Sequence, residues 1–192
     1  MNIGLYFGSF NPIHVGHLII ANQLVENSDL DQIWFVVTPH NPFKKKSTLL
    51  DNFQRLEMVY RATKDYTKLK ESDIEFNLPQ PNYTINTLTY LQEKHPDYQF
   101  SLIMGEDNLK SFHKWKNYEL ILDNHNIYVY PRISKGSIDT RFTDHNKIHK
   151  IEAPIMEISS TLIRNAIKKG KNVKPLLPEH VWDYLDEMNF YK

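Results

Sequence analysis

The sequence contains no cysteine, and its 23 acidic residues balance its 23 lysines and arginines. The lack of cysteine excludes disulfides, thiolate metal sites and cysteine nucleophiles, and it fits a reducing compartment such as the cytoplasm, where we expect the protein. A formal net charge of zero argues against a general binder of nucleic acids. The longest apolar run, Ile33–Val37, is too short to span a bilayer. We therefore expect no nucleic-acid partner, no membrane partner and no secretion signal.

The chain has the composition of a globular protein, with 41% hydrophobic and 24% charged residues, and its 192 residues fit one domain spanning 1–192. Apolar runs predict strands at Asn2–Phe7, Gln32–Thr38, Glu71–Phe76, Gln99–Met104, Asn126–Tyr130 and Lys147–Ile151. Helices are predicted at Val15–Glu26, Asn52–Lys64, Thr84–His95, Tyr118–Leu122, Ser160–Lys169 and Glu179–Met188. This alternation predicts an α/β fold, a Rossmann-like doubly wound and mostly parallel sheet with helices on both faces. Residues 158–192 would form a C-terminal helical part.

A ten-residue motif, GSFNPIHVGH at residues 8–17, joins the first predicted strand to the first predicted helix. The N–H groups at a helix start have no internal partner and lie at the positive end of the dipole, so this junction can bind an anion. Gly8 would let a phosphate approach the backbone, and Gly16 would permit close packing of helix on strand. His14 and His17 add side-chain donors on one side of the first turn. The alternative is that both histidines are ordinary residues of a helix start.

A second motif, ISSTLIR at residues 158–164, follows an extended stretch bounded by proline. Ser159 is a suitable N-cap, while Ser160 and Thr161 offer hydroxyl groups at a helix start. Arg164 lies one turn further on, and its guanidinium would point back toward that start. The combination suits a polyphosphate. Taken alone, the segment could also be a capped surface helix.

Together the two motifs resemble the (H/T)xGH and SxTxxR signatures of the nucleotidylyltransferase superfamily. Over essentially the whole chain, the sequence is similar to the bacterial nicotinate-nucleotide adenylyltransferases. The resemblance implies that His14, His17 and Arg164 are the catalytic residues. It also implies an ATP site made of Gly8, Ser9, Phe10, His14, Gly16, His17, Gly105, Asp107, Ser159, Ser160, Thr161 and Arg164.

The same resemblance implies a mononucleotide site made of Asn11, Lys44, Thr84 and Trp115. Residues 39–46 depart from the usual Pro-Pro-His-Lys pattern, so Lys45 or Lys46 could replace Lys44 at the substrate phosphate. Thr84 would help to place the nicotinate group, and Trp115 would stack on the pyridine ring. The alternatives are a solvated basic loop, a simple helix cap and generic packing of the tryptophan.

The implied reaction is adenylyl transfer from ATP to nicotinate mononucleotide, which gives nicotinic acid adenine dinucleotide and pyrophosphate in NAD biosynthesis. Mg²⁺ would bind mainly through the ATP phosphates. Zinc binding by His14 and His17 lacks a third ligand. Two other functions stay open: adenylyl transfer to another phosphorylated acceptor such as phosphopantetheine, and a non-catalytic nucleotide sensor. The oligomeric state also stays open, and a homo-oligomer is compatible with the sequence.

Overall fold

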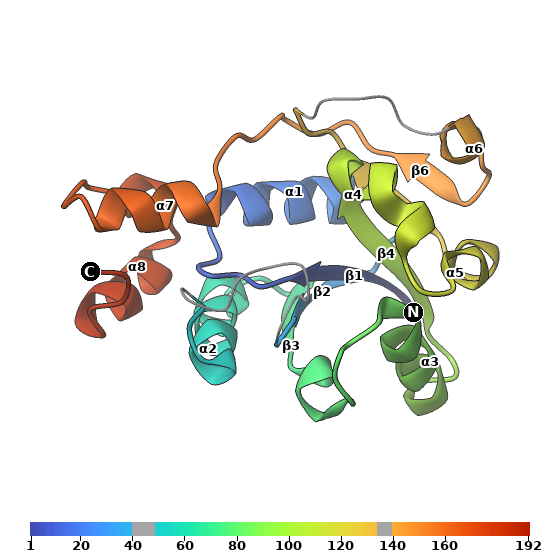
Figure 1. The fold of residues 1–192 in the computed structure, drawn as a ribbon, viewed down its shortest axis with the longest axis horizontal. Helices are drawn as coiled ribbons and strands as arrows, with labels where there is room; N and C mark the ends of the chain where they lie inside the picture. Colours follow the sequence, from blue (N-terminus) through green and yellow to red (C-terminus); the bar gives the residue numbers. More distant parts are fainter. Residues whose placement is uncertain (40–48, 134–139) are drawn as a thin grey trace.

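The computed structural model describes residues 1–39, 49–133 and 140–192. Six strands within these ranges form one sheet in the order β3-β2-β1-β4-β5-β6, and every neighbouring pair runs parallel (Figure 1). Their bounds are β1 Asn2–Gly8, β2 Gln32–Val37, β3 Leu69–Ser72, β4 Gln99–Gly105, β5 Ile127–Tyr130 and β6 Ile148–Lys150. The predicted fold class, a doubly wound parallel sheet, is confirmed.

The described α-helices are α1 Val15–Glu26, α2 Asn52–Thr63, α3 Thr84–Lys94, α4 Glu106–Ser111, α5 Tyr118–Asn124, α6 Thr140–Thr143, α7 Ser160–Ile167 and α8 Glu179–Glu187. Short 3₁₀ turns occupy Ile74–Asn77, Phe112–Lys114 and Lys174–Leu176. Within the described ranges, none of the helices has the length and apolar character needed to cross a membrane.

The strands are apolar on both sides because helices cover both faces of the sheet. Tyr6 of β1 faces a core shared with β2, α1, α2, α7 and α8. Leu5, its neighbour in β1, faces a separate core built with α3, α4 and α5. Figure 1 shows α1 and α3 on opposite sides of the sheet.

The order of the strands locates the place where a ligand would bind. From β1 the chain moves through β2 to β3, and it then returns to the other side of β1 to form β4. In open parallel sheets, ligands bind beyond the carboxyl ends of the strands at this point of reversal. Gly8 ends β1 and Gly105 ends β4, so both glycine turns lie at that point.

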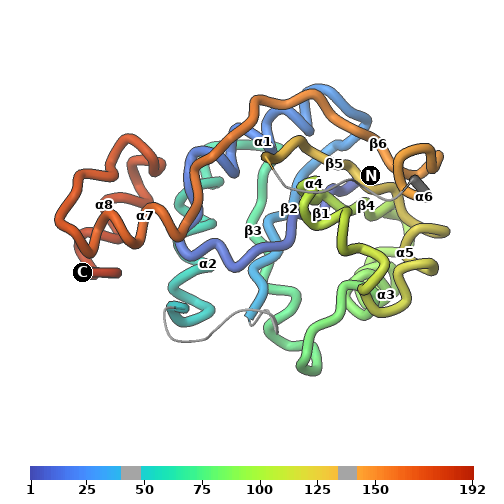
Figure 2. Tube along the Cα trace, turned by 45° about the horizontal axis from the view of Figure 1, so that its top comes forward, coloured from blue at the N-terminus to red at the C-terminus, as the bar shows by residue number. Residues whose placement is uncertain are grey.

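The C-terminal part brings the second motif next to the first. The segment from residue 151 to 159 runs along α1 to reach α7 (Figures 1 and 2). Its Met156 lies over Gly16, where an added Cβ would be 3.7 Å from the Cβ of Met156. Ile163 of α7 and Val181 and Leu185 of α8 are buried in the core that α1 and α2 share.

The predicted bounds of the third strand, Glu71–Phe76, are wrong. The strand is β3, Leu69–Ser72, and the chain then turns because the Ser72 hydroxyl accepts from the Ile74 N–H and the Asp73 carbonyl from the Phe76 N–H. The short helices α4 and α6 were not predicted, because helices of six and four residues are too short to show a 3.6-residue period. The bounds of the other elements agree with the prediction to within two residues.

Candidate active site

His14 and His17 form one unit at the start of α1. His14 is the N-cap residue, and its ring stacks on that of His17 with a centroid distance of 3.7 Å. The His14 N–H donates to Nδ1 of His17 at 3.2 Å, which holds the His17 ring over the start of α1. Both imidazoles therefore lie where the first N–H groups of α1 can bind an anion.

The electrostatic setting of His14 differs from that of a surface histidine. Its side chain is only 5% exposed, and its Nδ1 has no hydrogen-bond partner within the part of the chain that the structure describes. Burial, helped by the positive charge of Arg132, lowers the pKa of His14 to about 4. The imidazole is thus neutral at pH 7.

The two glycines of the first motif make room for neighbouring rings. A Cβ at Gly16 would lie 3.1 Å from Nδ1 of His14. A Cβ at Gly8 would lie 2.7 Å from the ring of Phe10, whose backbone is left-handed with a φ of 43°. Close packing at Gly16 therefore involves the His14 ring and residue 156 rather than a strand. Because the Phe10 side chain is buried in the core, only the backbone of Phe10 is open to a ligand at this end of the sheet.

The second motif meets the first in space. Ser159 caps α7 by accepting from the Leu162 N–H at 3.2 Å, as predicted. The Ser160 hydroxyl donates to the Pro12 carbonyl at 2.9 Å, a contact between residues 148 positions apart. Nη1 of Arg164 donates to the Asn11 carbonyl at 2.7 Å, and its Nη2 donates to Oγ1 of Thr161 at 3.2 Å. The guanidinium thus points back toward the helix start, as predicted.

A carboxylate and a guanidinium lie beyond β4 and β5. Asp107 is in the first turn of α4, and its Oδ2 lies 3.7 Å from Nη1 of Arg132. Gly105 makes room for both, because a Cβ there would lie 2.9 Å from Cδ of Arg132. Arg132 was not predicted from the sequence. Its position two residues after a buried strand was the signal that could have found it.

Thr84 and Trp115 belong to the other face of the sheet. Thr84 is the first residue of α3. Trp115 is half-buried and packs edge-to-face on Phe112 with a centroid distance of 5.5 Å. Nζ of Lys116 lies 4.5 Å from the centre of the Tyr83 ring, so the two segments are in contact. The candidate phosphate ligands Lys44, Lys45 and Lys46 lie outside the described residues.

A buried acid supports the start of α3. The carboxylate of Glu75 accepts from Oγ1 of Thr87 at 2.9 Å, and its carbonyl accepts from Nδ2 of Asn82 at 3.1 Å. Burial raises the pKa of Glu75, while hydrogen bonds from Thr87 and Thr38 act in the opposite direction. Glu75 thus joins the ends of β2 and α3. The role of Glu75 was not predicted from the sequence, because acidic residues are seldom buried.

Arg55 of α2 connects the first motif to the neighbouring loop. Its side chain is fully buried and donates to the carbonyls of Ser9, Thr38, Pro39 and Leu50 and to the side chain of Asn52, at 2.7–3.1 Å. Burial lowers its pKa to about 10, which still leaves it charged at pH 7. The sequence did not indicate that Arg55 is buried, because an arginine in an amphipathic helix usually lies at the surface.

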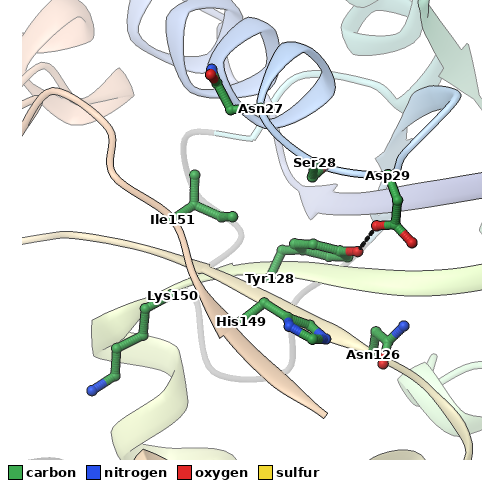
Figure 3. Close-up of a pocket in the computed structure, with 8 residues that line it drawn as sticks. All are labelled: Asn27, Ser28, Asp29, Asn126, Tyr128, His149, Lys150 and Ile151. Carbon is green, nitrogen blue, oxygen red and sulfur yellow. Dashed lines mark hydrogen bonds between the residues drawn. The ribbon is translucent and has the colours of Figure 1, made fainter. Parts of the chain in front are cut away.

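A hollow beside β6, near the amino ends of β2 and β5, contains none of the predicted site residues. It is lined by Asn27, Ser28, Asp29, Asn126, Tyr128, His149, Lys150 and Ile151 (Figure 3). The Tyr128 hydroxyl donates to the Asp29 carboxylate, and the Tyr128 and His149 rings stack. Figure 3 shows Lys150 pointing away from this pair. The two motifs meet at the opposite end of the sheet.

Comparisons with known proteins identify the family of the chain. The model of the cytidylyltransferase-like family matches residues 5–166. A relative from Flavobacterium psychrophilum is 70% identical over the full length of both chains, and one from Cytophaga hutchinsonii is 48% identical over all of this chain and 98% of its own. Both carry the name "Probable nicotinate-nucleotide adenylyltransferase". The same fold occurs in a solved structure, the Plasmodium falciparum nicotinic acid mononucleotide adenylyltransferase complexed with NaAD. The TM-score is 0.80 at 21% sequence identity, and the match covers 99% of this chain and 97% of that one. The chain therefore belongs to the nicotinate-nucleotide adenylyltransferase family.

Proposed function

We propose that the protein transfers the adenylyl group of ATP to nicotinate mononucleotide, which forms nicotinic acid adenine dinucleotide and releases pyrophosphate. One observation carries the proposal: Ser160 and Arg164 of the second motif donate to the backbone of the first motif, next to the paired histidines. The hydroxyl groups, the guanidinium and the imidazoles that bind phosphates therefore converge at one place. The curated relatives carry the name of this activity.

The chemistry needs positioning more than proton transfer. The phosphate of the mononucleotide is already an anion at neutral pH, so it attacks the α-phosphorus of ATP without a general base. The Pα–O bond to the pyrophosphate breaks as the new P–O bond forms. The barrier arises from the approach of two anions and from the charge that develops on the leaving pyrophosphate, so catalysis depends on orientation and on fixed positive groups.

We assign His14 and His17 to the α-phosphate and the leaving oxygen. Ser160, Thr161 and Arg164 would hold the β- and γ-phosphates. His14 is neutral in the free protein at pH 7. A bound triphosphate would raise the pKa of this imidazole, because nearby negative charge favours the protonated form.

Mg²⁺, when bound, would neutralise part of the triphosphate charge. The groups that the two motifs supply are imidazoles, hydroxyls and a guanidinium, which suit phosphate oxygens better than a hard cation. Among the described residues, no group of three or more His, Asp or Glu side chains could hold a metal. We therefore propose that Mg²⁺ binds mainly through the phosphates of ATP and keeps much of its water.

The acceptor assignment rests on Thr84 and Trp115. A half-buried tryptophan beside the start of α3 can stack on a pyridine ring, which a phosphopantetheine acceptor lacks. Lys44 would complete the proposed mononucleotide site. Asn11 was assigned to it as well, but its side chain is buried and its Oδ1 accepts from Tyr191 and Leu50, so we propose that Asn11 orients the phosphate loop rather than touching the mononucleotide. The sugar hydroxyls of ATP would donate to Asp107. ATP and nicotinate mononucleotide are small cytoplasmic metabolites, so we propose a cytoplasmic setting.

The test is pyrophosphate release from ATP and Mg²⁺ with three acceptors offered separately. We expect nicotinate mononucleotide to support release with a kcat/KM at least tenfold above that of nicotinamide mononucleotide or phosphopantetheine. Release with phosphopantetheine alone would overturn the acceptor assignment. Binding of ATP without release in any of the mixtures would favour a nucleotide sensor.

A further inference from the structure

We propose that Tyr191, in the segment after α8, is a positioning residue for the ATP site and acts through Asn11 of the first motif. The proposal rests on the proposed function, because it takes the loop between Gly8 and His14 to be the phosphate loop. Tyr191 lies 180 positions from Asn11 in the sequence, and neither motif includes it.

Asn11 is the point where four segments meet. Its side chain is 3% exposed, and its Oδ1 accepts from the Tyr191 hydroxyl at 2.6 Å and from the Leu50 N–H at 3.3 Å. Its backbone carbonyl accepts from Nη1 of Arg164 at 2.7 Å. The phosphate loop, the residues before α2, helix α7 and the C-terminal segment are thus tied to one asparagine.

The Tyr191 hydroxyl is suited to donate this hydrogen bond. Burial raises its pKa, although the charges of Arg164 and Arg55 act in the opposite direction, so the group keeps its proton at pH 7. A phenol donates through one O–H, and the Asn11 oxygen has two lone pairs, so both bonds at Oδ1 can form together. The hydrogen bond from Tyr191 therefore does not compete with the one from Leu50.

The backbone next to Tyr191 has an uncommon conformation, and the side chain of its neighbour Phe190 is packed in the core. Asn189 and Tyr191 have φ values of 53° and 65°, a left-handed conformation that few non-glycine residues adopt. Phe190, between them, is buried in the core and packs edge-to-face on Tyr184 with a centroid distance of 5.5 Å. Phe190 anchors the segment, and the turn then directs the Tyr191 hydroxyl to Asn11.

The same loop receives both contacts from the second motif, so its geometry matters for the phosphates of ATP. Asn11 accepts from Arg164, and Pro12, the next residue, accepts from Ser160. A change in the Asn11 side chain would shift the carbonyl that orients the Arg164 guanidinium. Tyr191 should therefore affect ATP binding and its use rather than the binding of the mononucleotide.

The first experiment compares Tyr191→Phe with the wild-type full chain. We expect the affinity for ATP, measured by calorimetry, and the kcat/KM for ATP to fall about three- to tenfold, the range of one net hydrogen bond, while the KM for the mononucleotide is unchanged. The matched control is Tyr184→Phe, which removes a hydroxyl from the same part of the chain and should leave all three values unchanged. Equal ATP values for Tyr191→Phe and wild type would overturn the proposal, as would an equal loss for ATP and mononucleotide.

A second experiment asks whether Tyr191 acts through Asn11. Adding Tyr191→Phe to an Asn11→Ala background should change ATP affinity by less than twofold, because the acceptor is already gone. A full additional loss would contradict the proposal. If the wild type binds ATP but transfers nothing to nicotinate mononucleotide, the proposed function fails while calorimetry still tests Tyr191. If the wild type does not bind ATP, both fail.

Discussion

The Arg164 guanidinium donates to the Asn11 carbonyl at 2.7 Å and so connects the helix start of the second motif to the loop of the first. A guanidinium has five N–H donors, and the bonds to Asn11 and Thr161 use only part of them. Arg164 can therefore hold the loop and still offer N–H groups to a phosphate. This double use explains how two segments at opposite ends of the chain can form one polyphosphate site.

Replacing His17 by alanine should remove a contact made to the transition state. By analogy with the loss of one oxyanion donor, we expect the barrier to rise by about 3–4 kcal/mol, with kcat reduced far more than KM is raised. Steady-state kinetics with ATP as the varied substrate measures both. A variant that keeps near-wild-type turnover would exclude His17 from the phosphate chemistry.

Much of the fold and of the phosphate site could be predicted from local signals. The N-cap predicted at Ser159 appears in the structure, because such a cap depends on residues three positions apart. Apolar runs located the strands, because such runs are also local features of the sequence.

Contacts between distant segments could not be predicted in this way. The roles of Arg55, Glu75 and Tyr191 arise from burial against loops that are remote in sequence, and nothing in their immediate neighbours indicates that burial. Residues 74–76 of the 3₁₀ turn at Ile74–Asn77 were taken for part of a strand, because Ile74 and Phe76 alternate with polar residues and a turn of four residues is too short to show a helical period.

Arg55→Ala should strongly destabilise the protein, because it leaves five acceptors of buried or partly buried hydrogen bonds without their donor. We expect the free energy of unfolding to fall by about 3–5 kcal/mol, the usual cost of removing one partner from a buried charged network. The control is Arg61→Ala on the same helix, where a partly exposed pair with Glu57 should cost about 1 kcal/mol or less. Equal urea midpoints for the two variants would show that the Arg55 bonds contribute little.

The low pKa of His14 predicts a pH dependence of stability. Its pKa is about 4 in the folded protein and 6.5 when unperturbed, so between these values the unfolded chain binds more protons and stability falls as the pH falls. Between pH 7.5 and pH 5, wild type should lose roughly 2 kcal/mol more than His14→Gln, which has no titrating group there. Urea unfolding at the two pH values measures this difference. Parallel losses in the two proteins would mean that His14 titrates normally in the folded state.

Trp115→Ala should weaken mononucleotide binding by about 1–3 kcal/mol if stacking on the pyridine ring resembles stacking on a nucleic-acid base. The affinity for ATP should stay within twofold of wild type, which separates a lost stacking partner from general damage. Calorimetric titration with each ligand gives both values. An unchanged affinity for the mononucleotide would leave Trp115 with a packing role against Phe112.

The most direct test of the central claim follows the α-phosphate of ATP. ATP labelled at the α-phosphorus is incubated with Mg²⁺, nicotinate mononucleotide and the protein, and the products are separated. Attack at the α-phosphorus predicts that the label enters nicotinic acid adenine dinucleotide and that the released pyrophosphate carries none. Label that stays in ATP, or that appears in AMP without any dinucleotide, would contradict adenylyl transfer as the reaction of this site.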